Sequence, residues 1–128
     1  SSDLLQYRSL RFETQLHDCN DWQGNAVINY TSAEVPWTRV IEHKHFELGN
    51  QSGQTLVTHE YPDTWTPEKI PYYPVNDAQN NQLYASYQKL AELFPKVHFS
   101  GRLGAFKYLD MHQIIAAALH SCKTLSRL

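Results

Sequence analysis

The sequence of 128 residues lacks several features that would each indicate a particular class of protein. No apolar run approaches the roughly 18 residues that a membrane-spanning helix requires, so we expect no membrane span. Lysine and arginine total 11 against 13 acidic residues, the formal net charge is -2, and the basic residues are spread along the chain. A nucleic-acid-binding surface needs clustered basic residues, so we also expect no nucleic-acid partner.

Cysteine and glycine are scarce as well. Cys19 and Cys122 lie far apart and match no metal or redox spacing, and we interpret them as reduced thiols in a cytoplasm. The five glycines form no Gly-x-Gly-x-x-Gly turn, so the main phosphate-binding turn of a dinucleotide enzyme is not in these residues. The segment 1–3 has no basic region followed by an apolar stretch, and we therefore expect no signal peptide.

Aromatic residues, by contrast, are plentiful, with 8 tyrosines and 3 tryptophans. Hydrophobic residues make up 41% and charged residues 19%, which is typical of a soluble globular protein. Aromatic rings with polar tips suit sugar rings and nucleobases, and they equally suit ordinary sheet packing. Composition alone therefore does not decide the function.

The pattern of residues predicts an α+β fold with an antiparallel sheet in the N-terminal half. Strand-forming residues gather in four runs, at residues 8–16, 25–31, 38–46 and 54–60. A proline-rich passage follows at residues 62–74. Three of its prolines prevent regular ladder pairing: Pro67, Pro71 and Pro74.

The second half changes to a helical period. Apolar residues recur at helical spacing through residues 78–94, with Asn76 or Asp77 as the cap, and a second helix is predicted from Asp110. A short strand is predicted at residues 97–100. We therefore expect an antiparallel sheet domain over residues 1–76, and over residues 77–128 a helix–strand–helix that would close a dinucleotide-binding α/β layer.

The first group that could carry chemistry lies in residues 35–46. If this segment is one strand, Arg39, His43 and His45 share a face. The planar fork of an arginine suits a diphosphate, although a solvated charged strand face explains the same residues. The His-x-His pair could also bind a metal with His59 as a remote third ligand, but a clear third ligand is missing and we predict no metal site.

Three further features allow two interpretations each. Glu60 ends a predicted strand, where its carboxylate could point into a cleft or lie at the surface. The two tyrosines of Pro71-Tyr72-Tyr73-Pro74 are stiffened by prolines, so they could hold a phosphate or a sugar oxygen, or could fill a packed loop. Asp110 opens a helix whose N-terminus attracts phosphate or an electron-rich ring edge, or it could serve only as the N-cap.

Taken together, these segments resemble UDP-galactopyranose mutases. The order and approximate spacing of the family occur in five places, at residues 25–30, 38–44, 60–62, 71–74 and 101–111. The resemblance runs from about Tyr7 to His120. Four residues depart from the pattern usual in bacterial members, without removing a charge that the chemistry needs: Trp37, His45, Phe106 and His112.

The resemblance implies an isomerase that interconverts UDP-galactopyranose and UDP-galactofuranose with reduced FAD as the nucleophile. It implies a cytoplasmic flavoprotein of cell-surface polysaccharide biosynthesis. The N-terminal dinucleotide-binding and helical domains of that family are absent from these residues, so we expect the isolated chain to be inactive. Surfaces that the missing domains would bury would allow a homo-oligomer to form.

The resemblance also assigns roles to individual residues. The implied catalytic residues are Arg39, Glu60, Tyr108 and Asp110. The implied substrate-binding residues are Asn29, Arg39, Tyr73 and Tyr108, and the implied cofactor-binding residues are Arg102, Tyr108, Asp110 and Met111. The alternatives are a non-catalytic nucleotide-sugar-binding or interaction module of the same fold, and a different flavoenzyme, against which the arginine and the paired tyrosines count.

Overall fold

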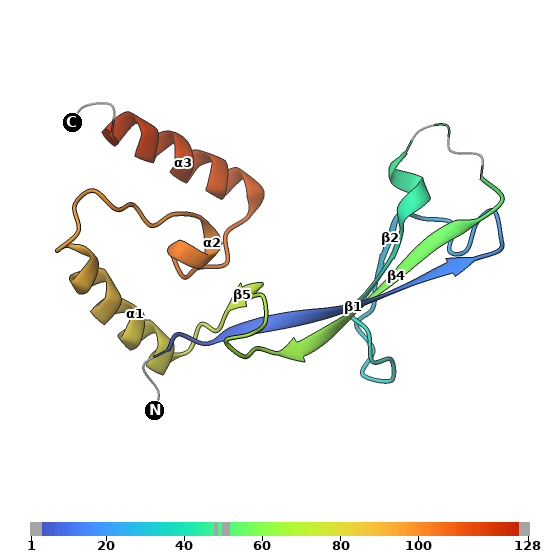
Figure 1. The fold of residues 1–128 in the computed structure, drawn as a ribbon, viewed down its shortest axis with the longest axis horizontal. Helices are drawn as coiled ribbons and strands as arrows, with labels where there is room; N and C mark the ends of the chain where they lie inside the picture. The colour runs from blue at the N-terminus through green and yellow to red at the C-terminus, as the bar shows by residue number, and fades with distance from the viewer. Residues whose placement is uncertain (1–3, 48, 50–51, 126–128) are drawn as a thin grey trace. The chain divides into compact units, whose positions relative to one another are not determined.

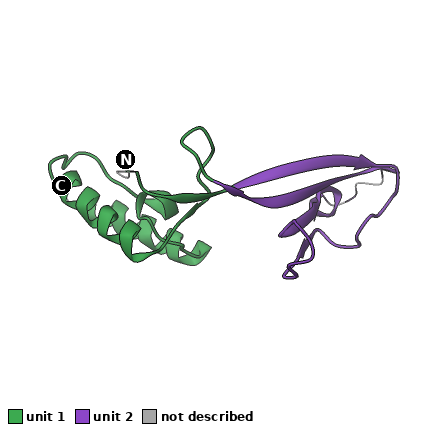
Figure 2. Cartoon of the chain, turned by 90° about the horizontal axis from the view of Figure 1, so that it is seen from below, with its two compact units in different colours: residues 1–9, 65–128 green, residues 10–64 purple. Residues whose placement is uncertain are grey.

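The computed structural model describes residues 4–47, 49 and 52–125. The chain divides into two compact units, which are described separately below: unit 1 comprises residues 1–9 and 65–128, and unit 2 comprises residues 10–64 (Figure 2). Strand β1 (Tyr7–His17; Figure 1) has residues 7–9 in unit 1 and residues 10–17 in unit 2. Strands and helices are both present, so the predicted α+β class is confirmed. Among the described residues, no helix is long and apolar enough to cross a membrane.

Unit 2 is built on a sheet. The strand order is β2-β3-β4-β1-β5, and β5 pairs with the part of β1 that lies in unit 1. The strands β2 (Val27–Asn29), β3 (Arg39–Glu42) and β4 (Thr55–Thr64) pair antiparallel in sequence order. The antiparallel sheet predicted for the N-terminal half is therefore confirmed.

Alternation of side chains explains why these segments are strands. Val40 and Val57 are completely buried, and they lie on the face of the sheet that also carries Glu42 and His59, because Val40 pairs with His59 and Glu42 with Val57. The strand continues through Pro62, beyond the predicted end at residue 60. An N–H group at residue 62 would point toward β3. Because β3 begins at Arg39, which lies opposite Glu60, it does not extend alongside Pro62, and no ladder bond is lost.

The third predicted strand is shorter than expected. β3 ends at Glu42, and residues His43–Phe46 form a 3-10 helix, η1. The prediction that Arg39, His43 and His45 share one strand face is therefore wrong beyond Glu42. The tight turn of η1 brings His45 back to the carboxylate of Glu42 three residues earlier, at 3.3 Å, a contact that an extended strand would not allow.

Glu42 is a fully buried acid that ties a loop to the sheet. Its carboxylate accepts hydrogen bonds from the backbone N–H groups of Trp22, at 3.1 Å, and Gln23, at 2.9 Å. Burial alone would raise the pKa of Glu42, but the Gln23 N–H, the Thr55 hydroxyl, the Trp22 N–H and the nearby His45 together outweigh it, and the pKa lies below its usual range. The loop before β2 is thus held against β3 by a charge and not by apolar packing alone.

Unit 1 contains the α-helices. The two-residue strand β5 (Tyr73–Pro74) pairs with Tyr7 and Arg8 of β1, and the helices are α1 (Ala78–Ala91), α2 (Gly101–Gly104) and α3 (Met111–Leu125). Asp77 caps α1 by accepting a hydrogen bond from the N–H of Asn80 at 2.7 Å. Both long predicted helices are confirmed, although the first ends three residues earlier than the apolar pattern indicated.

The strand predicted at residues 97–100 is wrong. In the described part of the chain, no strand pairs with this segment, and its side chains are largely exposed, with Phe99 at 62%. Strand-forming residues adopt ladder hydrogen bonds only where a neighbouring strand accepts them. The helix–strand–helix order is therefore not formed by these residues, and the dinucleotide-binding layer stays a prediction.

Phe106 is the centre of the packing in unit 1. Its side chain is 1% exposed and its ring contacts those of Tyr7 and Tyr84, with centroids 5.6 and 5.4 Å away. Its φ is 49°, in the left-handed region that usually requires glycine. The N–H of Phe106 donates to Leu103 O and that of Lys107 to Arg102 O, so α2 ends in a Schellman motif with phenylalanine at the glycine position.

We predict that Phe106→Ala destabilises the chain by about 3 kcal/mol, because it removes a buried ring and keeps the unfavourable φ. Phe106→Gly should be less destabilising than Phe106→Ala, since glycine adopts this φ freely. Urea unfolding followed by circular dichroism measures both. Phe99→Ala, at an exposed phenylalanine of the same unit, is the control, and a loss as large as that of Phe106→Ala would contradict the prediction.

Candidate functional site

The residues singled out from the sequence divide between the two units. Asn29, Arg39 and Glu60 lie in unit 2. The others lie in unit 1: Tyr73, Arg102, Tyr108, Asp110 and Met111. The structure brings together Asn29, Arg39 and Glu60 in unit 2. It brings together Tyr73, Arg102 and Tyr108 in unit 1.

In unit 2, the sheet register aligns three residues in one row. Asn29 pairs with Arg39 across β2 and β3, and Arg39 pairs with Glu60 across β3 and β4. Residues directly opposite one another point to the same face, so their side chains meet. The Nε of Arg39 donates to Asn29 Oδ1 at 2.9 Å, and a terminal guanidinium nitrogen lies 3.5 Å from Glu60 Oε2.

Glu60 is the buried member of this row. Its residue is 6% exposed, and its Oε1 accepts a hydrogen bond from the hydroxyl of Thr38 at 3.0 Å. The N–H of Thr38 also donates to Glu60 O at 2.9 Å. Thr38 was not predicted as a site residue from the sequence. The only indication in the sequence was its position next to Arg39, because the residue that it meets on another strand cannot be predicted from one segment.

The guanidinium of Arg39 is only partly occupied by these contacts. Its side chain is 40% exposed, and the two contacts above leave guanidinium N–H groups directed to solvent. An arginine whose orientation is fixed by an amide and a carboxylate, and whose fork remains accessible, is suited to bind an anion with two oxygens.

In unit 1, Arg102 orders a loop that carries Tyr108. Its Nε donates to Leu109 O at 2.7 Å, and its guanidinium lies over the ring of Tyr108, 4.4 Å from the centroid. The ring of Tyr108 also contacts that of Tyr73, with centroids 5.7 Å apart. Tyr108 is 59% exposed, so this group of three side chains in contact forms a surface and not a core.

Asp110 and Met111 begin α3. The N–H of Asp110 donates to Gln113 Oε1 at 2.8 Å, which is half of a capping box. The Asp110 carboxylate has no such partner within the described residues, and Met111 is exposed. The backbone cap is thus completed by Gln113, and the carboxylate stays available to a ligand.

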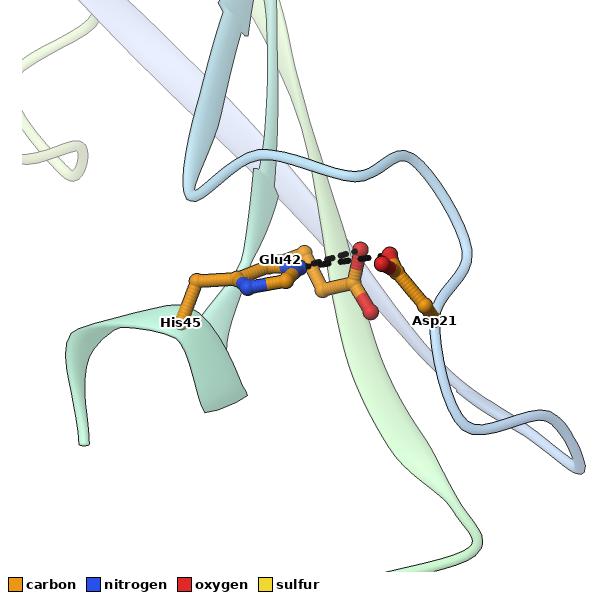
Figure 3. A group of neighbouring side chains, drawn as sticks. All are labelled: Asp21, Glu42 and His45. Carbon is orange, nitrogen blue, oxygen red and sulfur yellow. Dashed lines mark hydrogen bonds and ion pairs between the residues drawn. The ribbon is translucent and has the colours of Figure 1, made fainter. Parts of the chain in front are cut away.

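The three histidines considered as an alternative metal site, His43, His45 and His59, do not come together. His43 contacts the hydroxyl of Thr58 at 2.7 Å, on the face of β4 opposite to His59, whose ring packs between those of Trp22 and Trp37. His45 instead lies against two carboxylates, those of Asp21 and Glu42 (Figure 3). Only one of the three histidines therefore has other ligand atoms around it.

Comparison with known proteins gives these clusters a context. The family model described as UDP-galactopyranose mutase matches residues 1–108. The chain is 41% identical over 115 residues to a probable UDP-galactopyranose mutase of Klebsiella pneumoniae, covering 90% of this chain and 30% of that protein. It is 39% identical over 126 residues to a UDP-galactopyranose mutase of Mycoplasma pneumoniae, covering 94% of this chain and 31% of that one.

A third relative, a dTDP-fucopyranose mutase of Escherichia coli, is 36% identical over 116 residues, covering 91% of this chain and 31% of the relative. The chain thus spans about a third of the length of the curated relatives that it matches.

We predict that Arg39→Ala destabilises the chain by about 1 kcal/mol, because Glu60 keeps its buried carboxylate and loses its cation. The double variant Arg39→Ala with Glu60→Gln should recover most of this loss, since the neutral amide needs no cation. Urea unfolding of the two single variants and the double variant measures the coupling. Simple additivity of the single effects would contradict the coupling that we infer.

Proposed function

Because the chain belongs to the UDP-galactopyranose mutase family, we propose that it works as part of a longer mutase that interconverts UDP-galactopyranose and UDP-galactofuranose. The observation that carries this proposal is the row of Asn29, Arg39 and Glu60, in which an oriented arginine keeps an accessible fork. One relative is named a dTDP-fucopyranose mutase. Like UDP-galactopyranose, dTDP-fucopyranose is a pyrimidine nucleotide whose diphosphate carries a pyranose sugar.

Arg39, Tyr73 and Tyr108 are proposed to hold the diphosphate. When the bond between sugar and diphosphate breaks, negative charge develops on the departing nucleotide, and a guanidinium and two phenol hydroxyls oppose that charge. They also keep the detached nucleotide near the sugar, so that it can return. Asn29 belongs to the substrate side, where its amide oxygen fixes the Nε of Arg39.

The two carboxylates have different proposed tasks. Glu60 is buried and paired, so it sets the orientation of the Arg39 fork and competes with a bound diphosphate for the same cation. Asp110 is exposed at the start of α3, where it can accept a hydrogen bond from a sugar hydroxyl or from a cofactor ring. Both are assigned to the active site on the strength of the family pattern.

The residues of unit 1 fit a flavin. Arg102 of α2, Tyr108 of the following loop, and Asp110 and Met111 at the start of α3 give a cation, an aromatic face, a carboxylate and an exposed apolar side chain. Reduced FAD, when bound, would supply the nucleophile that the reaction requires. The protein's share is to orient the sugar and to hold the nucleotide, and none of these side chains needs to change its own oxidation state.

The proposal extends to the organisation of the whole enzyme. Residues 77–128 are proposed to close the FAD-binding part, with dinucleotide-binding and helical domains in the rest of the mutase, and the isolated chain is proposed to be inactive. The exposed apolar residues of α3, such as Ile115 and Leu119, fit a surface that another part of the protein or another copy covers. We place the mutase in the cytoplasm, in cell-surface polysaccharide biosynthesis.

We predict that Arg39→Ala, in the longer mutase that contains this sequence, lowers turnover of UDP-galactofuranose at least tenfold, because the leaving diphosphate loses its cation. Arg11→Ala is the control, since Arg11 is a strand arginine of the same unit that stacks on Tyr61 and lies outside the row. Near wild-type turnover of the Arg39 variant would remove its assigned role. Assay of dTDP-fucopyranose alongside tells which nucleotide sugar is preferred.

A second test concerns the isolated chain. We predict that material with an intact mass of 14.9 kDa shows no flavin absorbance and no mutase activity, because the proposal assigns half of the cofactor site to residues outside this sequence. The visible spectrum after incubation with FAD and gel filtration measures this. Retained flavin would mean that unit 1 binds the cofactor alone. If the longer protein also binds the nucleotide sugar without binding flavin, the non-catalytic module is favoured.

A further inference from the structure

Three side chains with metal-ligating atoms meet at one end of unit 2. Asp21 comes from the loop before β2, Glu42 ends β3, and His45 lies in η1 (Figure 3). One ligand atom from each lies within 4.8 Å of the other two. The imidazole Nε2 of His45 is 3.3 Å from Asp21 Oδ1 and 3.3 Å from Glu42 Oε2.

These two distances are long for hydrogen bonds and are compatible with metal coordination. A charge-assisted hydrogen bond between an imidazolium and a carboxylate is about 2.7–2.9 Å long. Two ligands bound to Zn²⁺ at about 2.0–2.1 Å in a tetrahedral arrangement are about 3.3 Å apart. The imidazole nitrogen thus lies equally far from one oxygen of each carboxylate, and this distance equals the ligand-to-ligand distance around a tetrahedral Zn²⁺.

The carboxylates are also held in place without the imidazole. Glu42 is completely buried and accepts hydrogen bonds from the N–H groups of Trp22 and Gln23. Asp21 Oδ1 accepts one from the N–H of Gly24 at 2.7 Å. Asp21 Oδ1 keeps a second lone pair for a metal, whereas Glu42 Oε2 accepts the Gln23 N–H at 2.9 Å and shares the Trp22 N–H with Oε1 through a longer contact of 3.3 Å. Ligands fixed by such outer hydrogen bonds bind a metal more tightly.

We propose that Asp21, Glu42 and His45 bind one divalent transition metal ion, for which Zn²⁺ is the reference, with water as the fourth ligand. Two carboxylates and a neutral imidazole balance the charge of the ion. Arg39 and Glu42 are three residues apart in one strand, so they lie on opposite faces. The metal therefore ties the loop before β2 to η1 and takes no part in the proposed reaction.

Calorimetric titration of the 128-residue chain with ZnCl₂, in a buffer that does not chelate zinc, tests the site. We expect saturable binding of one ion per chain and a dissociation constant that rises at least tenfold in both Asp21→Asn and His45→Ala. His120→Ala, at an exposed histidine of α3, controls for binding to histidines in general and should leave the constant unchanged. Circular dichroism in EDTA verifies that each variant is folded.

Cobalt gives a check that needs no variant. Co²⁺ bound to the wild-type chain should show the intense visible bands of a tetrahedral ion, and Zn²⁺ should displace it. Absence of saturable binding, a weak octahedral spectrum, or equal weakening in His120→Ala would overturn the site. These results are independent of mutase activity, so the metal site and the proposed function stand or fall separately.

Discussion

The row of polar residues in unit 2 depends on the register of three antiparallel strands. Because Arg39 stands opposite both Asn29 and Glu60, one guanidinium meets an amide and a carboxylate on the same face. A slip of one residue between β3 and β4 would turn Arg39 to the other face and leave the buried carboxylate of Glu60 without a cation. The candidate chemistry of the unit is thus a consequence of strand pairing.

Two different forces hold that register. Val40 and Val57 are fully buried on one face, and a slip of β3 by one residue against β4 would turn Val40 to the opposite face, away from Val57. On the same face, Glu42 accepts backbone N–H groups from the preceding loop, which fixes β3 lengthwise because charge-assisted hydrogen bonds tolerate little displacement. The apolar contacts decide which face is buried, and the carboxylate decides how far along the strand the loop is attached.

Local patterns predicted the strands of unit 2 and both long helices, since alternation and helical spacing are written within a few residues. Contacts distant in sequence could not be predicted. Thr38 meets Glu60 only through the register, and the apolar run at residues 97–100 has no strand beside it in the described structure. The left-handed φ of Phe106 was hidden because glycine usually marks such a position, and here a buried ring compensates for the strain.

Arg102 shows why a loss of activity does not by itself identify a ligand contact. Its carbonyl accepts the bond that closes the end of α2, its Nε fixes Leu109, and its guanidinium covers Tyr108. Replacing Arg102 would therefore displace the ring of Tyr108 even if no cofactor ever touched the arginine. Arg102→Lys keeps the charge and loses the planar guanidinium that covers Tyr108. If cofactor affinity survives in the lysine variant, the positive charge is what the cofactor needs. If affinity is lost while Tyr108 keeps its position, the fork geometry of the arginine is what the cofactor needs.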